Sequence, residues 1–105
     1  MLLEEAKREF EFDCRLRKLS DKTIKNYLKL LTYLFNYLRV EYDVEETSEV
    51  TVAQVKAFLI YMQRKGRTVN YQNDLLKVFK VFFRYIYEEG YTQILVTNKI
   101  KNARP

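Results

Sequence analysis

Residues that form tight turns are almost absent from this chain. Glycine occurs only at Gly66 and Gly90, and proline occurs only at Pro105. An all-β domain needs many such turns at defined positions. Apolar residues instead recur at three- and four-residue steps along most of the sequence. The pattern predicts an all-α fold, and a length of 105 residues predicts one domain with one hydrophobic core.

Two helices are predicted with clear signals at both ends. Thr51 and Gln54 have the spacing of a capping box, and Gly66 provides the left-handed residue that ends the helix. A later helix starts at about Thr68 and continues until Gly90. The residues predicted to face the core are Val52, Phe58, Leu59 and Met62 in the first of these helices, and Leu75, Leu76, Phe79, Phe82, Phe83 and Ile86 in the second.

Two further helices are predicted in the first half of the chain. Ser20 is a good N-cap, and Leu19 and Ile24 have the spacing of a hydrophobic staple, so one helix should run from about residue 21 to 42. Its apolar stripe comprises Ile24, Tyr27, Leu28, Leu31, Leu34, Phe35 and Leu38. A helix over residues 3–18 has a broken stripe, made of Leu3, Ala6, Phe10, Cys14 and Leu16.

The remaining segments are predicted to be loops or ends. The acidic stretch VEYDVEETSEV, residues 40–50, should form a solvated loop because like charges repel. Residues 92–105 should form a short tail with one helical turn near Asn98. We expect residues 1–9 and 98–105 to be frayed ends or linker. Residues 1–105 as a whole are predicted to form a single-domain four-helix bundle.

Several classes of function are disfavoured by composition. The chain has one cysteine, Cys14, and no histidine, so it offers neither a disulfide, a plausible metal cluster nor a Cys–His nucleophile pair. We predict no cofactor and no metal, with Cys14 as a packing residue in a reduced, cytoplasmic compartment. The chain shows no signal-peptide pattern and no apolar run of about 20 residues, so we predict a soluble, intracellular chain that does not cross a membrane.

Basic residues are concentrated in two blocks. Residues 15–39 and residues 50–87 each contain seven basic residues and one acidic residue. Opposite the apolar stripes lie Lys22, Lys25, Asn26, Lys29, Tyr33 and Asn36 on one helix, and Asn70, Asn73, Lys77, Lys80 and Arg84 on the last helix. Like charges four residues apart destabilise a helix, so an external anion is expected to offset them. Nucleic acid, a plain solvated face, and an acidic protein or membrane surface remain as alternatives.

DNA fits the chemistry of these two faces. Helix N-termini and lysines bind phosphate, and asparagine can bond adenine in the major groove. Asn26, Asn70 and Asn73 are candidates for base contacts, although Asn70 equally fits a helix-capping role. Stacking on single-stranded bases is a further hypothesis. The aromatic residues available for it are Tyr33, Tyr37, Tyr61 and Tyr71.

Three motifs together resemble a known family. LSDKTIKNYLKLL (residues 19–31), TVAQVKAFLIYMQRKG (51–66) and FKVFFRYIYEEGY (79–91) are similar in order and spacing to the N-terminal core-binding, SAM-like domain of tyrosine recombinases, the phage-integrase family. The resemblance covers residues 10–105. It implies that the second and fourth helices face the major groove of duplex DNA, while a separate C-terminal catalytic domain completes a clamp.

The resemblance also implies a set of DNA-binding residues. These are Lys22, Thr23, Lys25, Asn26, Lys29, Asn70, Tyr71, Asn73 and Lys77, and we add Arg67 to the predicted DNA-binding residues. Asp74 departs from the pattern because a carboxylate repels phosphate, and Asn98 is followed by Lys99 where the family often has proline. The segment KNARP, residues 101–105, resembles a linker to the catalytic domain.

The predicted function is therefore a non-catalytic, duplex-DNA-binding domain of a site-specific recombinase. The family's nucleophilic tyrosine acts with arginines, a lysine and a histidine, which lie in the catalytic domain, and this sequence has no histidine. The expected partners are double-stranded DNA, the catalytic domain of the same parent chain and other recombinase protomers. The alternative is a helical protein-interaction module that binds an acidic partner or a neighbouring protomer. A stand-alone enzyme is the least favoured interpretation.

Overall fold

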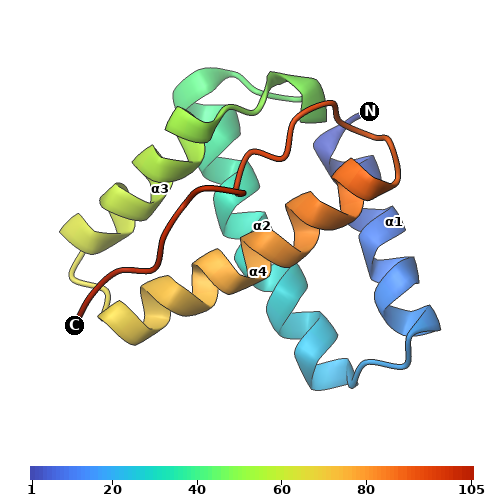
Figure 1. The fold of residues 1–105 in the computed structure, drawn as a ribbon, viewed down its shortest axis with the longest axis horizontal. Coiled ribbons are helices and arrows are strands. Elements are labelled where there is room, and N and C mark those ends of the chain that lie inside the picture. The colour runs from blue at the N-terminus through green and yellow to red at the C-terminus, as the bar shows by residue number, and fades with distance from the viewer.

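Four α-helices make up the fold. The computed structural model describes residues 1–105, and Figure 1 shows α4 crossing α2, with α1 and α3 to either side. The helices are α1 (Leu3–Leu16), α2 (Asp21–Tyr42), α3 (Val52–Arg64) and α4 (Val69–Glu88), with a short 3-10 helix, η1 (Thr47–Glu49), between α2 and α3. This arrangement confirms the predicted all-α, single-domain fold. None of the helices combines the length and the apolar character required to cross a membrane.

The predicted helix starts form through the expected hydrogen bonds. The Ser20 hydroxyl accepts from the Thr23 N–H at 3.1 Å at the start of α2. At α3 the Thr51 hydroxyl accepts from the Gln54 N–H at 3.2 Å, and the Gln54 amide oxygen accepts from the Thr51 N–H at 3.0 Å. Thr68 caps α4 in the same way. Each cap satisfies a backbone donor that the helix leaves free and stabilises the helix by about 1 kcal/mol.

The helix ends were only partly predictable. Gly66 and Gly90 follow α3 and α4 with φ values of +85° and +80°, as predicted from glycine's freedom in this region. The ends of α1 and α2 have the same left-handed conformation at Lys18 (φ 61°) and Asp43 (φ 55°). Without a glycine to mark it, the end of α1 was placed too late, because the helix stops at Leu16 and not at residue 18.

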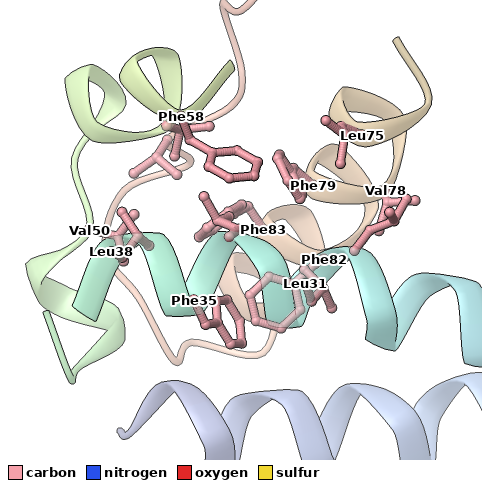
Figure 2. Close-up of a cluster of buried hydrophobic side chains, with 14 of the residues drawn as sticks. Leu31, Phe35, Leu38, Val50, Phe58, Leu75, Val78, Phe79, Phe82 and Phe83 are labelled. Atoms are coloured by element: carbon pink, nitrogen blue, oxygen red, sulfur yellow. The ribbon is translucent and has the colours of Figure 1, made fainter. Parts of the chain in front are cut away.

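Aromatic side chains from three helices form the centre of the core. Phe82 of α4 lies 5.4 Å from Phe10 of α1, 5.5 Å from Phe35 of α2 and 5.1 Å from Phe83, measured between ring centroids. Figure 2 shows Phe58 of α3 near Phe79 of α4, at 5.8 Å between centroids. These contacts link all four helices in one continuous apolar cluster.

The predicted core needs corrections of two kinds. Leu16 is 80% exposed at the last residue of α1, and Val52 is exposed at the first residue of α3, since neither terminal position is covered by another helix. Leu30 and Val78 are buried although they were not in the predicted stripes. Both α2 and α4 pack against all three other helices, so each buries a wider face than one stripe.

The acidic segment between α2 and α3 is packed and not simply solvated as predicted. Val44, Thr47 and Val50 are buried, and the Thr47 hydroxyl donates to the Tyr91 carbonyl at 3.0 Å. The Glu49 carboxylate accepts from two backbone N–H groups of this segment, which lowers the pKa of Glu49. Val44, Thr47 and Val50 recur at three-residue steps and anchor the segment, while its charged side chains face water.

The N-terminal residues are held against this acidic segment. The Thr47 N–H donates to the Met1 carbonyl at 2.8 Å, and the Leu3 N–H donates to the Glu45 carbonyl at 2.9 Å. The N-terminal ammonium group lies 2.8 Å from the Glu46 carboxylate. Residues 1–9 were expected to be a frayed end. In the structure α1 instead begins at Leu3, because these contacts with the α2–α3 connection hold its first turn.

The C-terminal segment runs back along the groove between α3 and α4. Figure 1 shows it ending beside the connection between these two helices. Val96 and Ile100 are buried, and the Asn98 N–H donates to the Leu95 carbonyl at 3.2 Å. The turn expected near Asn98 is therefore present as hydrogen-bonded turns and not as a helix. The role of residues 98–105 as a linker stays a prediction.

Candidate nucleic-acid interface

A groove lined by lysines lies where α4 crosses α2. Its volume is about 790 Å³, and its lining comes from α2 and from one residue of α4. We call it the basic groove and define it by Lys22, Thr23, Lys25, Asn26, Tyr27, Lys29 and Lys77. The crossing of the two helices brings Lys77 next to residues that precede it by about fifty positions. The tertiary structure thus places one residue of the basic α4 face, Lys77, beside the basic residues of α2.

The charge of the basic groove has no internal compensation. None of its lysines forms an ion pair, and its lining contains no acidic residue. The ion pairs of the chain join Lys7 and Arg39 to Glu4, Arg15 to Glu11 and Asp21, Arg17 to Asp13, and the N-terminus to Glu46. No group of three or more His, Cys, Asp or Glu side chains could hold a metal ion. The groove is suited to a bound polyanion.

The start of α2 adds polar groups at the edge of the basic groove. The Ser20 hydroxyl donates to the Thr23 hydroxyl at 2.9 Å while it caps the helix, which leaves the Thr23 hydroxyl proton available to a ligand. Asp21, in the first turn, lies 3.3 Å from the Arg15 guanidinium of α1. This pairing draws the acidic side chain toward α1 and reduces its repulsion of an anion.

The first turns of α4 present a second set of predicted residues. The Arg67 guanidinium lies 5.2 Å from the centre of the Tyr71 ring, an arrangement typical of a cation–π contact. Asn70 is exposed two turns before Lys77, and Tyr71 is half-buried. Asp74 is exposed between them and forms no ion pair. Arg67 and Asn70 are free to contact a ligand, with Tyr71 supporting Arg67.

Asn73 has a structural partner that the sequence did not reveal. Its side-chain nitrogen donates to the Ala103 carbonyl at 3.2 Å, and its side-chain oxygen accepts from the Ala103 N–H at 2.8 Å. Both ends of the amide are therefore used to hold the C-terminal segment against α4. The predicted base contact by Asn73 is not available in this conformation, since it would require release of Ala103.

The predicted basic face of α4 is divided between two surfaces. Lys77 belongs to the basic groove, whereas Lys80 and Arg84 line another groove that also contains Asp13, Glu88 and Glu89. The reason is the length of α4, whose 20 residues extend from α3 to the acidic helix α1. Lys80 and Arg84 consequently lie in a surface of mixed charge.

A second opening lies between α2 and α3, beside Arg67. Its volume is about 450 Å³, and three tyrosines contribute to its walls. We call it the aromatic cleft and define it by Tyr33, Asn36, Tyr37, Val40, Glu41, Phe58, Tyr61, Met62, Lys65 and Arg67. Sequence reasoning selected Tyr33, Tyr37 and Tyr61 as candidates for exposure. It missed Lys65, because nothing in the local sequence separates this lysine from others near a helix end.

Replacing Asn73 with alanine is expected to release the C-terminal segment. Two hydrogen bonds disappear, and the free energy of unfolding should fall by about 1–2 kcal/mol. Amide hydrogen exchange at Ala103 should become fast, because its only partner is the Asn73 side chain. Asn70→Ala is the matched control, since the Asn70 side chain forms no hydrogen bond to the segment. Slow exchange at Ala103 in the Asn73→Ala protein would contradict this role.

Comparisons with known proteins agree with this architecture. The sequence model of the family described as phage integrase, N-terminal SAM-like domain, matches residues 7–93. A comparison with curated proteins gave no match. A solved structure described as a lambda integrase dimer bound to a COC′ core site contains a similar chain, with a TM-score of 0.82 and 17% identity. The similarity covers 100% of the present chain and 29% of the integrase chain, and at this identity it shows a shared fold.

Proposed function

Because this chain belongs to the phage integrase N-terminal SAM-like domain family, we propose that it is a non-catalytic domain that binds duplex DNA within a site-specific tyrosine recombinase. The observation that supports this most directly is the basic groove. Four lysines from two helices meet there, without an acidic residue or an ion pair among them. Such a surface attracts the phosphate backbone whatever the base sequence.

The residues of α2 have two roles in the proposed complex. Lys22, Lys25 and Lys29 neutralise phosphates, and Thr23 donates its hydroxyl to a phosphate oxygen. Asn26 lies between the lysines and contacts a base edge, since the major groove is about 12 Å wide and admits a helix. Most of the affinity is electrostatic. For the domain alone we expect a dissociation constant on the order of micromolar or weaker at physiological salt.

The residues of α4 extend the proposed interface. Lys77 binds phosphate in the basic groove, and Arg67 and Asn70 provide further contacts at the start of the helix. Tyr71 positions Arg67 through the face of its ring. Asn73 takes part only if the C-terminal segment detaches from it. The interface is thus proposed to be centred on α2 and completed by the first half of α4.

Catalysis is proposed to reside in another part of the parent protein. The present chain spans 29% of the length of the lambda integrase chain that it matches. The resembled family uses a histidine with its nucleophilic tyrosine, and none of the nine tyrosines here has a histidine to act with. We propose that residues 1–105 act as the core-binding domain and residues 98–105 as part of the linker. A C-terminal catalytic domain of the same parent chain and neighbouring protomers are its partners.

An apolar pair on α1 favours a second role in protein interaction. Phe12 is 74% exposed and Leu16 is 80% exposed, and they lie four residues apart on one side of the helix. Contiguous exposed apolar surface can mark a contact between proteins, and this pair provides the apolar part of such a surface. A neighbouring protomer could cover them while DNA occupies the basic groove, so the two roles are compatible.

A titration followed by NMR separates these two functions. Addition of a DNA duplex should shift the amide signals of residues 20–30 and 67–80, because these segments form the proposed interface. Polyglutamate of equal charge serves as the control for unspecific attraction of anions, and it should give smaller shifts at the same protein concentration. Shifts by the duplex that are confined to residues 3–18 would contradict DNA binding by α2 and α4, whereas equal shifts by polyglutamate and the duplex would support binding of an acidic protein partner.

A further inference from the structure

The aromatic cleft has partly exposed aromatic side chains between α2 and α3. Tyr37 lies at its centre, 5.1 Å from Tyr61 and 5.2 Å from Phe58 between ring centroids. Tyr33 is 43% exposed and Tyr61 is 41% exposed, so both retain free surface beside this packed centre. Burial raises the pKa of the Tyr37 hydroxyl. The floor of the cleft is therefore packed, and its aromatic walls are accessible to a ligand.

Two cations lie at the rim of the cleft. The Lys65 ammonium group is 3.2 Å from the Tyr61 hydroxyl and 5.0 Å from the centre of its ring. The Arg67 guanidinium is held over Tyr71 at 5.2 Å. Neither cation forms an ion pair. A ligand with an aromatic body and a negative group would contact both the rings and the cations.

The lining also has groups that can bond a polar ring edge. The Asn36 side-chain oxygen accepts from Arg39, which leaves the Asn36 amide nitrogen as a donor. Glu41 contributes a carboxylate, which accepts from a ring N–H or an exocyclic amino group of a base and repels phosphate. A purely aliphatic ligand would leave these groups unused. A volume of about 450 Å³ is within the usual range for pockets that bind small organic molecules.

We propose that the aromatic cleft binds the base of an unpaired DNA nucleotide, with its phosphate at Lys65 and Arg67. Bases inside a duplex are stacked and cannot reach such a cleft, so the site selects single-stranded or extruded nucleotides. Tyr33 follows Lys29 by one helical turn, which places the cleft beside the basic groove on α2. The proposed site shares Arg67 with the proposed duplex interface, but its tyrosines lie outside the basic groove, and its occupancy can be measured without duplex DNA.

Tyrosine substitutions test this site with a short single strand as the probe. The affinity for a six-nucleotide oligothymidylate should fall by roughly 5-fold to 150-fold in Tyr33→Leu and in Tyr61→Leu, as expected for the loss of one stacked base. Tyr87→Leu is the matched control, because Tyr87 is 44% exposed on α4 outside the cleft. Tyr33→Phe should retain the affinity, since it keeps the ring. Circular dichroism establishes that each variant is folded.

A second probe separates base stacking from phosphate binding. An abasic oligomer of the same length has the phosphates without the bases, so its affinity should be lower than that of oligothymidylate and unchanged by Tyr33→Leu. Duplex affinity should change by less than about twofold in the tyrosine variants, which distinguishes this site from the duplex interface. No binding of oligothymidylate, or equal affinity for both single-stranded probes, would overturn the proposal. So would equal losses in Tyr33→Leu and Tyr87→Leu.

Discussion

Replacing Lys25 and Lys29 together with glutamate is expected to weaken duplex DNA binding by roughly 30-fold or more at 0.15 M salt. Each phosphate contact releases about 0.9 counterion from the DNA when the protein binds. At this salt concentration, the loss of one contact therefore lowers the binding free energy by about 1 kcal/mol. The two new carboxylates also repel the phosphates. Helix content should not change, because both positions are exposed and glutamate has a helix propensity similar to that of lysine.

The salt dependence of binding provides a second measurement on the same variant. Fluorescence anisotropy with a labelled duplex gives the affinity at several salt concentrations. The slope of log affinity against log salt should become smaller by roughly 1.8 when two phosphate contacts are lost. The control is Lys56→Glu with Lys99→Glu, which changes the net charge equally in the groove between α3 and the C-terminal segment. Unaltered affinity in the Lys25 and Lys29 variant would exclude α2 from the interface.

Replacing Phe82 with alanine is expected to lower the free energy of unfolding by about 3–5 kcal/mol. The Phe82 ring is fully buried and lies within 5.5 Å of the rings of Phe10, Phe35 and Phe83, measured between centroids. Its removal leaves a cavity where α1, α2 and α4 meet. Domains of this size typically have only about 5–15 kcal/mol of stability, so the variant should be close to unfolding.

Denaturant unfolding followed by circular dichroism measures this loss. Phe12→Ala is the matched control, because it is the same substitution at a site that is 74% exposed on α1. Its effect should be smaller than about 0.5 kcal/mol, as is usual for surface positions. Equal destabilisation by the two substitutions would show that Phe82 does not organise the core.

Much of the fold could be predicted because its signals are local. Ser20, Thr51 and Thr68 start their helices as predicted, and Gly66 and Gly90 follow the ends of α3 and α4. Each of these signals depends on residues within four positions of one another, so no knowledge of the tertiary structure was required. The identity of most buried residues followed from helical periodicity in the same way.

Other features had no local signal. Lys18 and Asp43 end helices in a conformation that is rare for residues other than glycine. The contact between Asn73 and Ala103 joins residues 30 positions apart, and the sequence offered a base-contacting role for Asn73 that was equally consistent with its position. Lys80 and Arg84 appeared to continue the basic face of α4, but the proximity of α1 gives their surface a mixed charge.

The sequence by itself determined four helices, their capping residues and the presence of basic faces on the second and fourth. Only the tertiary structure decided that Lys77 joins the α2 lysines in one groove and that Tyr33, Tyr37 and Tyr61 share one cleft. The physical reason is that helix formation depends on neighbours along the chain, whereas the crossing of α2 and α4 depends on many weak contacts among Phe10, Phe35, Phe82 and the rest of the core.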